Sequence, residues 1–232
     1  MGDFAFDIVG FDLDGTLVDT SRDLTHAVNH ALALAGRPLL TLDQVAPMIG
    51  GGAKNTLRQA LDASGGCDDA QFRRLYHALL GHYEAHLADE SAPFPGALAA
   101  LDALAARGVR LGIVTNKFER FAEALLAALG LRDRFACLIG GDSLGPGNAK
   151  PSPAPIHALV ERCRASGGGG RAAFVGDSIY DVGAARAAGV PVVAVSFGFL
   201  LGPVEELGAD AVIHGFAELV PALERLGALQ PG

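Results

Sequence analysis

The chain has 232 residues, of which half are hydrophobic and 19% are charged, so it can bury a sizeable core and is unlike a disordered protein. Its formal net charge of -8 argues against nucleic-acid binding, which normally needs a basic face. A local group of cations, or a metal ion, could still make one cleft attractive to an anionic substrate.

Short, β-rich apolar runs alternate with helical stretches along most of the chain. The runs predict buried parallel strands at residues 6–11, 109–114, 137–139, 172–175 and 192–195. Between them, helices are expected at residues 97–106, 121–129, 156–164 and 184–188, and a flexible glycine loop at 167–170. This alternation predicts a doubly wound parallel α/β sheet of the Rossmann-like kind.

Residues 20–92 break the alternation. Thr20 and Asp23, like Thr41 and Gln44, have the spacing of a helix capping box, and residues 71–86 are typical of another helix. We therefore expect two parts: a catalytic core of residues 1–19 and 93–232, and an inserted all-helical domain of residues 20–92.

Four groups of polar residues follow predicted strands, where α/β sheets bind ligands. The first is Asp12-Leu-Asp14-Gly-Thr16, in which two carboxylates two residues apart project to one side of an extended segment. One carboxylate can attack phosphorus while the other donates and then removes a proton. The other groups are Thr115-Asn116, Lys150-Pro151 and Gly176-Asp177-Ser-Ile-Tyr-Asp181.

These four groups, in this order, resemble the haloacid dehalogenase superfamily of phosphotransferases, over nearly the whole chain. The resemblance implies an Mg²⁺-dependent phosphatase acting on a small phosphorylated metabolite, with the helical insert as a cap over the site. It implies that Asp12 is the nucleophile and Asp14 the acid and base. Asp12, the backbone carbonyl of Asp14, and Asp177 would bind the metal, and Asp181 would orient those ligands or bound water.

The remaining core residues have electrostatic roles by the same resemblance. Lys150 would neutralise Asp12 and the phosphate, while Thr115 and the N–H of Asn116 would hold phosphate oxygens. Because like charges repel, a carboxylate that attacks a phosphate needs a cation between the two, and an oxygen-only ligand set suits Mg²⁺.

Within the superfamily, the cap loop is most similar to the phosphoglycolate phosphatase group. Gly50, Gly51 and Gly52 precede Lys54 and Arg58 in a segment that could contact the substrate. The chain departs from that group at Arg22, where proline is common, and at residues 145–148, before the catalytic lysine. These departures leave the exact substrate open.

Other activities of related chemistry stay open or are disfavoured. Sugar-phosphate and nucleotide phosphatases share the same core, and a phosphomutase would keep all four groups. A dehalogenase of the superfamily lacks the second acid, so Asp14 argues against it. A receiver domain is shorter and has no helical insert.

The cysteines, the N-terminus and the histidines give further expectations about location and metal binding. Three cysteines without a CxxC motif, an acidic N-terminus, and no apolar run near the roughly 20 residues that span a bilayer predict a soluble, cytoplasmic protein. It could be a monomer or a homodimer. His26/His30 and His82/His86 have chelating spacing but no obvious third ligand, so we expect them to be ordinary cap residues.

Overall fold

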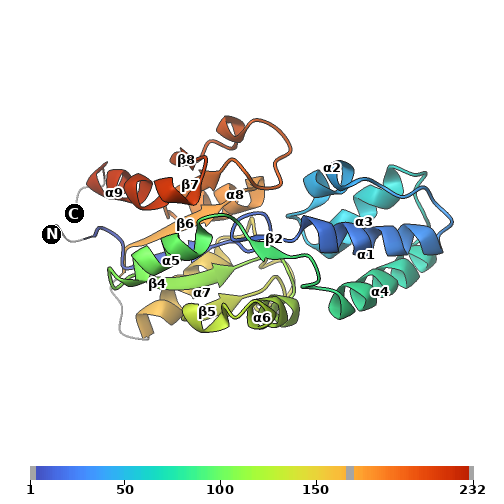
Figure 1. The fold of residues 1–232 in the computed structure, drawn as a ribbon, viewed down its shortest axis with the longest axis horizontal. Coiled ribbons are helices and arrows are strands. Elements are labelled where there is room, and N and C mark those ends of the chain that lie inside the picture. The colour runs from blue at the N-terminus through green and yellow to red at the C-terminus, as the bar shows by residue number, and fades with distance from the viewer. Residues whose placement is uncertain (1–3, 166–169, 230–232) are drawn as a thin grey trace.

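The computed structural model describes residues 4–165 and 170–229, which form a sheet with flanking helices and a second group of helices beyond one end of its strands (Figure 1). Most of the loop expected at 167–170 lies outside the described residues. Within the described ranges, no helix is long and apolar enough to cross a membrane.

The main sheet confirms the predicted doubly wound architecture. In the described residues it has six strands in the order β5-β4-β1-β6-β7-β8, and every neighbouring pair is parallel. The strands are β1 (Ile8–Phe11), β4 (Arg110–Val114), β5 (Cys137–Ile139), β6 (Ala172–Gly176), β7 (Val192–Val195) and β8 (Ala211–Ile213). Sequence analysis missed β8 because it has only three residues, of which Ala211 and Val212 are only partly buried, and it lacks a long apolar run.

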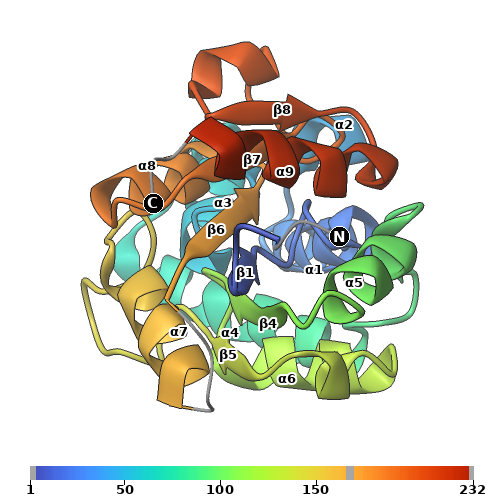
Figure 2. The ribbon, with the colours of Figure 1, turned by 90° about the vertical axis from the view of Figure 1, so that its left-hand side faces the viewer.

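Helices cover both faces of this sheet, as Figure 2 shows. One face packs against α5 (Ala97–Ala105), α6 (Glu119–Ala128) and α9 (Leu219–Leu229), and the other against α7 (Ala154–Ala165) and α8 (Ile179–Ala187). β1 serves both layers, because Val9 and Phe11 join the first apolar cluster while Ile8 joins the second. A strand buried on both faces explains the continuous apolar run that marked it in the sequence.

The helices beyond the strand ends have an apolar cluster of their own. They are α1 (Ser21–Leu34), α2 (Leu42–Val45), α3 (Ala53–Asp62) and α4 (Asp69–Ala85). Val28, Leu57 and Leu75 lie in this cluster, which Phe121 of α6 also joins. Short 3₁₀ helices complete the described elements at Ala46–Met48, Arg132–Arg134, Val204–Leu207 and Phe216–Glu218.

Two short strands connect the helical group to the sheet. β2 (Val18–Asp19) pairs antiparallel with β3 (Ala92–Pro93), so the chain leaves and returns at one place. The capping box predicted for Thr20 and Asp23 is wrong. The hydroxyl of Thr20 donates to Asp14 Oδ1, and Asp23 accepts from the backbone N–H groups of Glu90 and Ser91. These two side chains secure the connection to the sheet instead of capping α1.

Candidate active site

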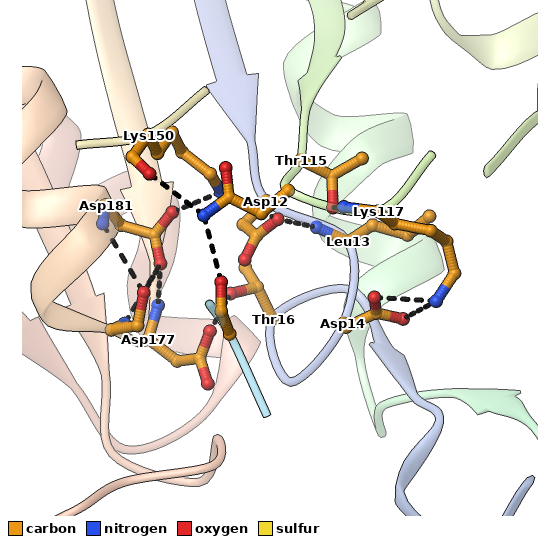
Figure 3. A network of polar contacts seen from close by, with 12 residues as sticks. Asp12, Leu13, Asp14, Thr16, Thr115, Lys117, Lys150, Asp177 and Asp181 are labelled. Atoms are coloured by element: carbon orange, nitrogen blue, oxygen red, sulfur yellow. Dashed lines mark hydrogen bonds and ion pairs between the residues drawn. The ribbon is translucent and has the colours of Figure 1, made fainter. Parts of the chain in front are cut away.

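The four predicted polar groups meet at one edge of the sheet. Asp12, Thr115 and Asp177 are each the first residue after a strand, namely β1, β4 and β6, which are neighbours in the sheet. Lys150 reaches them from the loop between β5 and α7. Figure 3 shows these side chains converging. The parallel strand order therefore brings together residues that are far apart in the sequence.

Lys150 bridges two buried carboxylates. Its Nζ lies 2.8 Å from Asp12 Oδ1 and 2.5 Å from Asp181 Oδ1. Asp12 Oδ1 also accepts a hydrogen bond of 2.7 Å from the N–H of Leu13. These contacts fix the orientation of the Asp12 carboxylate at the end of β1.

The charges around Asp12 are strongly perturbed by burial. Burial, with the nearby Asp181 carboxylate, raises the pKa of Asp12 to about 7, although Lys150 opposes the change. For Lys150, burial favours the neutral amine, but Asp12 and Asp181 outweigh it and raise its pKa to about 12. The lysine therefore stays charged, and full ionisation of the nearby acids would give more negative charge than one lysine can neutralise.

Asp12, Asp177 and Asp181 form a buried acidic cluster whose oxygens lie within 4.8 Å of one another. Burial, followed by the charges of Asp181 and Asp12, raises the pKa of Asp177 well above its usual value. The cluster offers only oxygen ligands, and its three carboxylates outnumber the single lysine. It therefore fits a hard divalent cation such as Mg²⁺.

The backbone shapes this cluster closely. Asp177 accepts from the hydroxyl of Thr16 at 3.0 Å and from the N–H of Phe199 at 2.7 Å. Gly15 has a φ of +81°, and a Cβ there would lie 2.4 Å from Asp177 Oδ2. Glycine is therefore required both for the turn after β1 and for the space beside Asp177.

Asp181 is held at the start of α8. Its Oδ2 accepts from the hydroxyl of Ser178 at 2.5 Å and from the N–H of Ser178 at 3.0 Å, while Oδ1 faces Lys150. Both oxygens thus have protein partners, which suits an orienting role better than a displaceable ligand.

Asp14 lies on the opposite side of Asp12 from this cluster (Figure 3) and forms an ion pair with a second lysine. Lys117 Nζ lies 2.7 and 2.8 Å from the two oxygens of Asp14, and Thr20 donates to Asp14 Oδ1 at 2.8 Å. Although burial alone would lower the pKa of Lys117, the Asp14 carboxylate outweighs it and the pKa is raised.

Sequence reasoning did not assign a role to Lys117. The available signal was its position: a cation two residues after Thr115, in the loop that follows a central strand and precedes α6.

Thr115 and Asn116 follow β4 beside the cavity. The Thr115 hydroxyl accepts from the N–H of Lys117 at 3.3 Å. The Asn116 amide nitrogen donates to the carbonyls of Gly50 and Lys150 at 3.0 and 3.1 Å, so it connects the loop before α3 to the sheet edge. Its Oδ1 is buried without a hydrogen-bond partner among the described residues.

A cavity of about 370 Å³ opens between the sheet edge and the helical group of α1–α4. From the helical group it is lined by residues that include Gly50, Gly51, Gly52, Lys54 and Tyr83. From the sheet edge it is lined by Asp12, Asp14, Thr115, Asn116 and Lys117. The predicted cap residue Arg58 is not among the lining residues. Its guanidinium lies 3.8 Å from the ring centroid of Phe72 and makes an ion pair of 3.8 Å with Asp69.

Comparisons with known proteins agree with this geometry. A family model described as haloacid dehalogenase-like hydrolase matches residues 6–189. A phosphoglycolate phosphatase of Caulobacter vibrioides is 44% identical over 92% of this chain and 89% of its own. One of Rhodospirillum rubrum is 43% identical over 96% of this chain and 91% of its own.

A solved structure gives the same picture. The crystal structure of a predicted phosphoglycolate phosphatase from Haemophilus somnus superposes with a TM-score of 0.86 at 31% identity, covering 95% of this chain and 99% of that one. The similarity therefore extends over the sheet and the helical group together.

Proposed function

The chain belongs to the haloacid dehalogenase-like hydrolase family and is a phosphoric monoester hydrolase, and we propose that it hydrolyses 2-phosphoglycolate through a phosphoryl group carried by Asp12. The observation that carries this proposal is the placement of Asp12, which is buried at the end of β1 between Lys150 and the acids Asp177 and Asp181. The names of the relatives support the substrate.

In the first step, a carboxylate oxygen of Asp12 attacks phosphorus as the bond to the ester oxygen breaks. Asp14, protonated, gives its proton to that leaving oxygen, and an alcohol departs. Lys150, the hydroxyl of Thr115 and the N–H of Asn116 hold the non-bridging oxygens, where negative charge gathers.

In the second step, water attacks the phosphorus of the phospho-aspartate. Asp14, now ionised, takes a proton from the water, and inorganic phosphate leaves as the Asp12 carboxylate re-forms. A bound Mg²⁺ would neutralise phosphate charge as the carboxylate approaches. Asp12, Asp177 and the backbone carbonyl of Asp14 would hold it, with Asp181 orienting these ligands.

We also propose that residues 20–92 act as a cap over the core of residues 1–19 and 93–232. The β2–β3 pair places Asp19 and Pro93 together at the connection, where hinges would let the cap close. Closure would exclude water during phosphoryl transfer, and opening would admit it for the second step. The oligomeric state and the cytoplasmic location stay predictions.

A phosphatase assay over a panel of metabolites, run with and without divalent cations, tests the proposal. We expect 2-phosphoglycolate to give the highest kcat/KM, activity to disappear in EDTA, and Mg²⁺ to restore it. Ca²⁺ should inhibit, because its looser coordination misplaces the phosphate. A preference for sugar phosphates or nucleotides, or full activity after exhaustive chelation, would contradict it.

A further inference from the structure

The side of the cavity next to Asp14 contains two groups that the proposed mechanism does not use. Lys117 is buried and its Nζ lies 4.7 Å from the ring centroid of Tyr83, which comes from α4 of the cap. Tyr83 is 3% exposed, and its hydroxyl has no hydrogen-bond partner among the described residues. A buried hydroxyl without a partner is costly, so it indicates a place where a polar ligand group belongs.

The direction of the reaction places the leaving group on this side. Asp14 must reach the ester oxygen that leaves, so the organic part of the substrate extends from Asp12 toward Asp14. The ammonium of Lys117 lies 2.7 Å from Asp14, and both residues line the cavity with Tyr83. The leaving group therefore meets a cation and, beside it, the buried Tyr83 hydroxyl.

We propose that Lys117 and the Tyr83 hydroxyl form the subsite for a carboxylate on the leaving group. The subsite rests on the proposed function and deepens it, because it assigns the acidic part of the substrate to named residues. In the structure the ammonium of Lys117 is paired with the Asp14 carboxylate, and both carboxylate oxygens lie within 2.8 Å of it. A substrate carboxylate would exchange with Asp14 at this ammonium and leave Asp14 free to serve the ester oxygen.

This arrangement favours acidic substrates in two ways. The first is the charge-assisted contact itself, which a neutral leaving group cannot make. The second is the release of Asp14 from its ion pair, which uses part of the binding free energy but leaves Asp14 free for proton transfer and so raises kcat. Because Tyr83 lies on α4 of the cap, the subsite is complete only when α4 lies against the sheet domain.

Lys54 is the competing cation. It also lines the cavity, but its side chain is exposed, whereas Lys117 is 8% exposed. An exposed ammonium is screened by water and contributes little to recognition. The buried lysine should therefore discriminate more strongly between acidic and neutral esters.

The test compares 2-phosphoglycolate with its amide, which has the same size and no carboxylate charge. We expect Lys117→Met to reduce kcat/KM for 2-phosphoglycolate about 30-fold more than for the amide, the range of a buried charge-assisted contact. Lys117→Arg should recover part of the difference. Tyr83→Phe should reduce kcat/KM about fivefold more for 2-phosphoglycolate than for the amide, since it removes one hydrogen bond to the carboxylate.

Tyr76→Phe is the matched control, because Tyr76 lies on the same helix and also lines the cavity. It should treat the two esters alike, and thermal melts of each variant should show intact folding. Lys117→Met also removes the ion-pair partner of Asp14, which should lower kcat/KM for both esters. The ratio of the two kcat/KM values therefore isolates the contact with the substrate carboxylate.

The outcomes separate the inference from the proposed function. If the wild type prefers 2-phosphoglycolate but Lys117→Met lowers kcat/KM equally for both esters, the subsite is wrong and the proposed function stands. If the wild type hydrolyses the amide as well as the acid, both the subsite and the 2-phosphoglycolate assignment are overturned.

Discussion

The sheet edge and the cap use their charged residues in different ways. At the sheet edge, Lys150 and Lys117 are buried against carboxylates. In the cap, ion pairs such as Arg22 with Glu90, at 3.6 Å, are exposed, and the interior is apolar. Buried ion pairs are costly to retain unless geometry is tight, whereas exposed pairs contribute little. The chemistry should therefore depend on the sheet edge, and the cap should tune access and substrate choice.

The largest expected effect is at the nucleophile. Asp12→Asn should reduce turnover below about one hundredth, since the carboxamide is nearly isosteric but a poor nucleophile, and acid–base assistance alone is worth about 10²–10⁴. Steady-state kinetics measures it, with a thermal melt to show that the fold is intact. The exposed Asp133→Asn is a matched control that should keep wild-type activity. Activity above one hundredth would show that Asp12 is not the nucleophile.

A smaller effect, and a substrate-dependent one, is expected at Asp14. Asp14→Asn should slow 2-phosphoglycolate hydrolysis much more than formation of p-nitrophenolate in the first turnover, because p-nitrophenolate leaves without protonation. Single-turnover kinetics on the two esters gives the comparison. Equal losses would assign Asp14 mainly to another role, such as holding Lys117.

The cap residues should give weaker effects, and in a definite order. Lys54→Ala should raise KM for 2-phosphoglycolate about two- to fivefold, as expected for an exposed charge beside the cavity. Arg58→Ala should leave KM nearly unchanged and lower the free energy of unfolding by about 0.5–1 kcal/mol, since Arg58 packs over Phe72. A larger increase in KM for Arg58→Ala than for Lys54→Ala would show that Arg58, and not Lys54, is the cap residue that recognises the substrate.

The smallest effect concerns pH and the cap histidines. His30, His82 and His86 bring their rings together between α1 and α4, with centroid distances of 4.5 and 4.6 Å. Partial burial, then His30, His86 and His26, lower the pKa of His82, and Asp89 opposes them. Glu90 also faces this group through His26.

Because the folded-state pKa of His82 is depressed, its neutral form is favoured by folding. The contribution to stability is present above pH 6.5, the ordinary value, and is lost as pH falls through the lower folded-state pKa. His82→Gln should therefore flatten the fall in melting temperature below pH 6.5. An unchanged slope would show that His82 does not contribute to the pH dependence of stability.

The sequence predicted the sheet edge better than the cap for a physical reason. Asp12, Thr115 and Asp177 each follow a strand, and parallel pairing brings strand ends together whatever lies between them. Spacing on a helix does not say which face meets a ligand, so Arg58 was grouped with Lys54 although it packs on Phe72. The Lys117–Asp14 ion pair and the facing histidines depend on tertiary contacts, which no local pattern encodes.

The most direct test of the account is to trap the phosphoryl group on Asp12. In Asp14→Asn with p-nitrophenyl phosphate, the first step needs no acid but the second still needs a base, so the phospho-aspartate should accumulate. Rapid acid quenching and peptide mass spectrometry should then find one phosphoryl group on Asp12, in an amount equal to the burst of p-nitrophenolate. A phosphoryl group on another residue, or a burst with no covalent label, would contradict the account.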